Sequence, residues 1–114
     1  MELEEMILAS DQQVSAEQAI VGAILLDEKC LTEVRAAVRP EMFAIHRNRE
    51  AFVAACALQD KKRRIDPVTV GIKVREENGD TDWTNEYALQ LMEAAVTPAN
   101  VMSHCEVLKS EYTT

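Results

Sequence analysis

Glycine and proline are scarce in this sequence, in which each occurs three times among 114 residues. Both residues disfavour the interior of a helix, so long stretches without them favour helices. Apolar residues make up 47% of the chain, which is enough for a core and excludes intrinsically disordered and collagen-like classes. A chain of this length folds as one domain on one core. We therefore expect an all-α fold, a compact bundle of about six helices.

Capping signals and apolar periodicity divide the chain into helices. Ser15 and Gln18 match the capping box, which predicts a first helix from Ser15 and an N-terminal arm over residues 1–14. Small residues around Gly22 on the apolar face of this helix would let a neighbouring helix approach closely. Further helices are expected over about 28–38 and 46–61, from Thr84 along an apolar face that includes Tyr87, and from Asn100 onwards.

Local signals disagree over residues 68–74. Asp66 and Pro67 are typical of the N-cap and first residue of a helix, because proline has no N–H to leave unpaired there. The β-branched residues at positions 68, 70, 72 and 74 nevertheless alternate with other residues at the period of a strand. A lone strand would find no partner in a chain otherwise free of strand patterns. Helix is therefore the favoured interpretation.

The chain is acidic, with 12 Lys and Arg against 20 Asp and Glu and a net charge of −8. Most of the affinity of a protein for nucleic acid comes from its cationic side chains, so this chain is not expected to bind DNA by itself. One cationic patch stands out, a basic loop formed by Lys61, Lys62, Arg63 and Arg64. It suits the negative end of the preceding helix dipole. It is either a solvated helix terminus or a contact for phosphate or an acidic partner.

The sequence predicts no catalytic, cofactor-binding or metal-binding residues. It contains no P-loop, and His46 and His104 have no neighbours at a spacing that would assemble a nucleophile or a metal site. Cys30, Cys56 and Cys105 are odd in number and lack C-x-x-C spacing, which indicates reduced thiols. With no apolar run long enough to span a membrane and no signal peptide, we expect a cytoplasmic chain without a membrane partner.

The last predicted helix carries an apolar stripe. Val101, Cys105, Leu108 and Tyr112 are spaced four, three and four residues apart, as in the seam of a coiled coil. Such a stripe either packs in the core or associates with a second copy. If it is a seam, replacing Leu108 with Asp should leave a folded monomer, whereas a core position would unfold.

Short motifs run in order along the chain. Residues 15–27, SAEQAIVGAILLD, resemble the pattern EAEQAVLGALLLD, and residues 39–43, RPEMF, resemble kPeDFy. His46 followed by residues 51–52 resembles H..If.., and residues 65–70, IDPVTV, resemble iDlvTv. Residues 87–91, YALQL, resemble YLaeL, and residues 98–101, PANV, resemble saANi. This series, from about residue 14 to 110, resembles the N-terminal domain of bacterial DnaB-type replicative DNA helicases.

The resemblance implies an all-helical collar domain over residues 15–99 and, over residues 100–114, the first arm of a truncated helical hairpin. It implies pairing into dimers, assembly of the parent protein as a hexamer (a trimer of dimers), and docking of primase and of a helicase loader. ATP, Mg and DNA would be bound only by a motor domain outside this chain, which would itself be non-catalytic. Tyr87 matches a position near the primase-docking surface, although a core role is equally consistent. The alternative is a stand-alone helical adaptor or helicase regulator.

Overall fold

The computed structural model describes residues 9–95 and 97–113, and these contain helices and turns but no strand. The α-helices are α2 (Asp11–Leu26), α3 (Leu31–Ala37), α4 (His46–Asp60), α5 (Pro67–Asn78), α6 (Asn85–Ala95) and α7 (Val101–Thr113). Single 3₁₀ turns precede α3 (Glu28–Cys30), α4 (Pro40–Met42) and α7 (Pro98–Asn100). The prediction of an all-α bundle of about six helices is confirmed.

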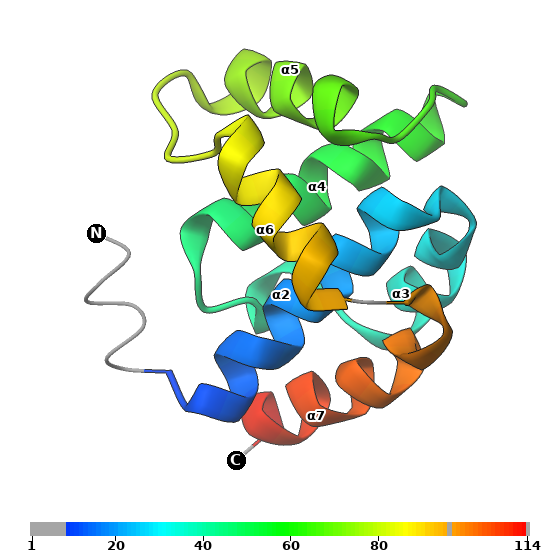
Figure 1. Cartoon of the computed structure of the whole chain (residues 1–114), viewed down its shortest axis with the longest axis vertical. Helices are drawn as coiled ribbons and strands as arrows, with labels where there is room; N and C mark the ends of the chain where they lie inside the picture. The colour runs from blue at the N-terminus through cyan, green and yellow to red at the C-terminus, as the bar shows by residue number, and fades with distance from the viewer. Residues whose placement is uncertain (1–8, 96, 114) are drawn as a thin grey trace.

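Helix α2 is the centre of the bundle and packs against α6, α7 and α4 (Figure 1). Its apolar residues Ile20 and Ile24 are fully buried together with Phe43 and Phe52, whose rings stack with centroids 4.9 Å apart. Gly22 lies where α6 crosses α2, and a Cβ there would come within 2.0 Å of the backbone oxygen of Leu91. The predicted close approach of a helix at Gly22 is confirmed.

The predicted start of the first helix is wrong. Ser15 does not cap it, because α2 begins four residues earlier, at Asp11. Ser10 is the N-cap of α2: its backbone is extended, so the helix begins at the next residue, and its Oγ accepts the backbone N–H of Gln13 at 3.0 Å. Ser10 Oγ also donates to the carboxylate of Glu111, which joins the start of α2 to α7. Residues 11–14 of the predicted arm are therefore helical, and residues 1–8 lie outside the described residues.

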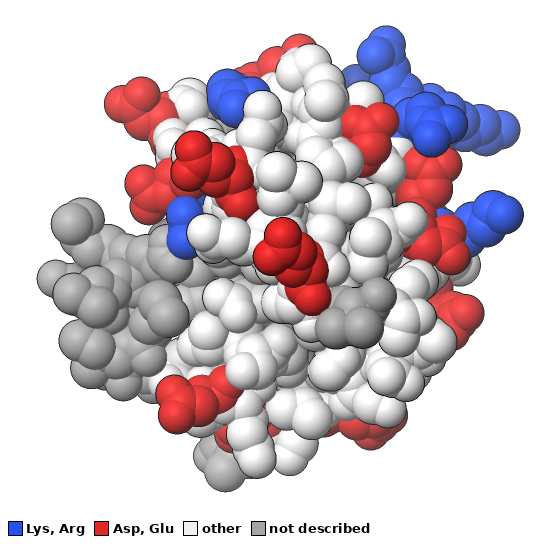
Figure 2. Space-filling model, in the orientation of Figure 1, with Lys and Arg blue, Asp and Glu red and all other residues white. Residues whose placement is uncertain are grey.

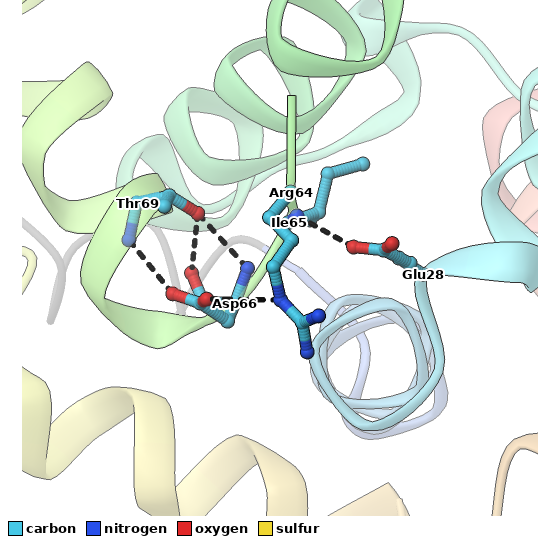
Figure 3. Close-up of polar contacts among 5 residues, drawn as sticks. All are labelled: Glu28, Arg64, Ile65, Asp66 and Thr69. Atoms are coloured by element: carbon cyan, nitrogen blue, oxygen red, sulfur yellow. Dashed lines mark hydrogen bonds and ion pairs between the residues drawn. The ribbon is translucent and has the colours of Figure 1, made fainter. Parts of the chain in front are cut away.

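Residues 68–74 are helical, as the capping signal predicted. Asp66 and Thr69 form a reciprocal capping box: Asp66 Oδ1 accepts the N–H of Thr69 at 2.9 Å, and Thr69 Oγ1 accepts the N–H of Asp66 at 3.0 Å (Figure 3). The β-branched residues at alternate positions do not all lie on one face, as they would in a strand. Val70 and Val74 are buried, whereas Val68 and Ile72 are exposed, and both pairs have the four-residue spacing of a helix.

Candidate protein-interaction site

Glu17 is a fully buried carboxylate on α2. Its Oε2 accepts the N–H of Ala44 at 2.6 Å, and its Oε1 accepts the N–H of Ile45 at 3.2 Å and the side-chain amide of Asn48 at 3.0 Å. Ile45 is the N-cap of α4 and makes no side-chain cap bond. Burial raises the pKa of Glu17, while these hydrogen bonds and the nearby charge of Arg49 oppose the rise. The carboxylate therefore fixes the start of α4 against α2.

The same cluster holds Tyr87 in the core, where the side chain is 4% exposed. Its hydroxyl donates to Asn48 Oδ1, and its ring meets Trp83 edge to face with centroids 5.5 Å apart. The guanidinium carbon of Arg47 lies 3.3 Å from the centroid of the Tyr87 ring, and Arg47 donates to the backbone oxygen of Asp82 at 3.3 Å. The half-buried Arg47 thus covers the tyrosine ring and ties the start of α4 to the residues before α6. The predicted nearness of Tyr87 to a primase-docking surface stays a prediction.

The basic loop follows α4, and its shape is set by the backbone. Lys62 adopts a left-handed conformation with φ of 57°. The N–H of Lys62 donates to the oxygen of Gln59 at 2.9 Å, and the N–H of Arg63 donates to the oxygen of Leu58 at 2.9 Å. These two bonds form a Schellman motif, in which the left-handed position is usually glycine. The loop is therefore a defined helix terminus that carries a lysine at a strained position.

Two contacts hold the far end of the basic loop (Figure 3). The N–H of Ile65 donates to Glu28 Oε2 at 2.6 Å, and Arg64 Nε lies 3.9 Å from Asp66 Oδ2. Lys61, Lys62 and Arg63 are exposed, and none forms an ion pair within the described ranges. Figure 2 shows Lys and Arg side chains gathered at the upper right, over the connection between α4 and α5. Three cations of the loop are thus available to an anionic partner.

A shallow hollow of about 260 Å³ lies beside the loop, between the end of α4 and α5. We call it the α4–α5 hollow; its lining comprises Leu58, Lys61, Arg63, Thr69, Ile72, Lys73 and Glu76. Its apolar part includes Ile72, which is 52% exposed and lies one turn after Val68, which is 64% exposed. We call Ile72 the floor of the hollow, and Lys61 and Arg63 its rim. The apolar floor and the cationic rim together form a surface suited to a partner that is both apolar and acidic. Sequence reasoning identified the rim but missed the apolar lining residue Ile72, because position 72 was considered only as a strand or helix marker.

The stripe on the last helix packs within the domain. Val101, Cys105 and Leu108 are all buried, since α7 lies against α2 and α3, and only Tyr112 is exposed, at 51%. In this conformation three of the four residues are part of the core, which favours the core alternative for them. The self-association face formed by these residues stays a prediction, because the spacing of an apolar stripe is the same whether its partner belongs to the same chain or another.

The described residues offer no metal centre, since they contain no group of three or more His, Cys, Asp and Glu side chains that could hold an ion. His46 is exposed at the start of α4, and His104 is half-buried on α7. Burial raises the pKa of Cys30 and Cys105 to about 11 and raises that of the half-buried Cys56, so these thiols stay protonated near neutral pH. No helix in the described part is both long and apolar enough to cross a membrane.

Comparison with known proteins places this arrangement among replication proteins. The pattern of the family described as DnaB-like helicase N-terminal domain matches residues 9–110. The chain is similar to the replicative DNA helicases DnaB of Rhodothermus marinus (29% identity, 85% of this chain, 10% of the relative) and Geobacillus stearothermophilus (29% identity, 88% of this chain, 22% of the relative). It thus spans under a quarter of either relative. Its fold is similar to the crystal structure of the N-terminal domain of DnaB helicase from Mycobacterium tuberculosis, with a TM-score of 0.79, 21% identity, and 87% and 69% of the two chains covered.

Proposed function

Because this chain belongs to the family of DnaB-like helicase N-terminal domains, we propose that it is the assembly and protein-docking domain of a replicative DNA helicase. The observation that carries the proposal is the family match along almost the whole chain, over a fold of the same kind. The buried positions of Cys30, Cys105 and Glu17 support a structural role for these groups instead of a catalytic one.

In this proposal the parent protein unwinds DNA in the cytoplasm during replication. ATP, Mg and DNA are bound by a motor domain that this chain does not contain, since its sequence has no P-loop. The partners of the present domain are further copies of itself, in a hexamer built as a trimer of dimers, together with primase and a helicase loader. Such roles need exposed, chemically distinct surfaces on a rigid scaffold, and the α4–α5 hollow is a surface of that kind. The half-buried Arg47 is the second position that we propose for contact with a partner.

Calorimetric titration with the C-terminal domain of primase from the same organism tests the docking role. We expect a saturable heat with wild-type chain and a weaker one with Arg47→Ala, which removes the cation over Tyr87. Arg39→Ala, an exposed arginine on another part of the surface, is the matched control. An absence of heat up to high micromolar concentrations of both proteins would contradict primase docking, and sedimentation equilibrium of the chain alone tests self-association separately.

A further inference from the structure

We propose that the α4–α5 hollow binds residues 1–8 of a second copy of this chain. The inference rests on the proposed role in self-association and names the surfaces that would carry one contact. It starts from two features that the proposed function leaves unused: a cationic, apolar hollow on an acidic domain, and an acidic, apolar segment at the beginning of the sequence.

The hollow offers charge and apolar surface side by side. Lys61 and Arg63 are exposed at its rim and form no ion pair among the described residues. Lys73 lines the same hollow but is already engaged, with its Nζ 3.9 Å from Glu76 Oε1. The apolar side chain of Ile72, on α5, lines the same hollow, and half of it is open to solvent. A matching ligand therefore needs carboxylates for the rim and at least one apolar side chain for the floor.

Residues 1–8, MELEEMIL, have that composition. Glu2, Glu4 and Glu5 supply three carboxylates, and the remaining five residues are all apolar. No lysine or arginine occurs before position 29, so no cationic side chain close in the sequence competes for these carboxylates. The segment and the hollow are complementary in charge and in apolar character.

The segment of the same molecule is poorly placed to fill the hollow. Helix α2, which Ala9 and Ser10 precede, begins in the lower part of Figure 1, whereas the connection between α4 and α5 lies at the upper right. The domain extends 34 Å along this axis. The four residues from Ala9 back to Glu5 span at most about 14 Å when fully extended, and the seven back to Glu2 about 25 Å. A second copy can present the segment without this constraint, and a contact of one copy's segment with the next copy's hollow builds chains or closed rings.

A nucleic acid is the less favoured occupant. Its phosphates would be drawn to the same cations, but an extended backbone would also meet Glu76 in the hollow and a domain of net charge −8 around it. The apolar floor gives phosphate no additional contact. A short peptide that brings both carboxylates and apolar side chains uses the whole surface.

Sedimentation equilibrium of the 114-residue chain at low salt tests the proposal with three charge variants. The hollow variant is Lys61→Glu with Arg63→Glu, and the segment variant is Glu4→Lys with Glu5→Lys. The control is Lys29→Glu with Arg39→Glu, which changes the net charge as much as the hollow variant does but at exposed sites elsewhere. Far-UV circular dichroism verifies that each variant is folded.

We expect the hollow and segment variants each to weaken association about tenfold or more, and the control to leave it within about twofold. An equimolar mixture of the two weakened variants should recover association, because the segment of one and the hollow of the other are intact. High salt should weaken the wild-type association, since exposed charges are screened beyond about 10 Å at 0.1 M. Titration with a synthetic peptide of residues 1–8 should shift the amide resonances of Leu58 and Ile72.

Four results would overturn the inference: a monomeric wild-type chain, association that neither variant changes, equal weakening by the control, or a mixture that fails to associate. Binding of a single-stranded oligonucleotide that the hollow variant loses would identify the hollow as a phosphate site instead. Association that persists in both variants leaves the proposed function intact and removes only this contact. A chain that neither associates nor binds primase contradicts the proposed function itself.

Discussion

The crossing of α2 and α6 at Gly22 predicts an unusual response to a small substitution. An alanine Cβ at this position would lie 2.0 Å from the backbone oxygen of Leu91 and 2.6 Å from its carbonyl carbon. Ordinary contacts between such atoms are about 3.5 Å, so α6 would have to retreat by more than about 1 Å. The obstacle is backbone, which no rotamer change can relieve, and the retreat would loosen the buried Ala88 and Leu91.

The expected magnitude follows from two opposing effects. Overpacking of a core costs about 1–3 kcal/mol, and a backbone obstacle belongs at the top of that range. Replacing glycine with alanine inside a helix stabilises the helix by about 1 kcal/mol, because glycine has the lower helix propensity. We therefore expect Gly22→Ala to lower the free energy of unfolding by about 2 kcal/mol and the melting temperature by about 8 °C.

Urea unfolding followed by the fluorescence of the buried Trp83 measures this change, and α5 provides a matched control. In Gly71→Ala the nearest atom to the new Cβ is a terminal nitrogen of Arg75 at 3.2 Å, which belongs to a flexible, exposed side chain. This variant should be as stable as the wild type or more stable by up to about 1 kcal/mol. The reasoning is refuted if Gly22→Ala is no less stable than the wild type, or if the two variants shift together.

Three further changes have defined outcomes. Leu108→Asp should unfold the domain, because it places a carboxylate at a fully buried site, whereas the exposed Tyr112→Ser should remain folded by circular dichroism; a folded Leu108→Asp monomer would contradict the core assignment. Lys62→Gly should raise the urea midpoint by an amount equivalent to about 0.5–1 kcal/mol, since glycine adopts the left-handed conformation without strain, and an unchanged midpoint would show that this strain is absent. Burial raises the pKa of Glu17 above 4.5, so its contribution to stability is greatest below that pH and declines as the pH rises through the folded-state pKa. The stability of the wild type relative to Glu17→Gln should therefore fall from acid to neutral pH in urea titrations, and a rise would contradict the direction of the shift.

Much of the helical layout could be predicted because caps are local. The N-cap at Asp66 and the close approach at Gly22 depend on residues within one turn or on small size, and both occur in the structure as predicted. The start of α2 could not be predicted from local signals alone. Two serines, at positions 10 and 15, offer capping side chains, and the choice between them depends on contacts with distant residues, including the bond between Ser10 and Glu111.

The candidate sites were harder to predict because they join distant segments. Glu17, Asn48 and Tyr87 come from three helices, and no sequence spacing connects them. A signal was nevertheless present for Glu17, which precedes Ile20, Val21 and Ile24 by three, four and seven residues and therefore lies on the apolar face of its helix. The apolar stripe of α7 shows the converse limit, since periodicity identifies a buried face but not the chain that buries it.

Sequencing the native coding region downstream of the Thr114 codon tests the central claim most directly. If this is the N-terminal domain of a replicative helicase, the reading frame continues into a second domain that contains the P-loop pattern G-x-x-x-x-G-K-[ST], which cradles the phosphates of ATP. A stop codon within a few residues of Thr114 would contradict the account. The chain would then have no motor, and a stand-alone helical adaptor or helicase regulator would explain the family resemblance.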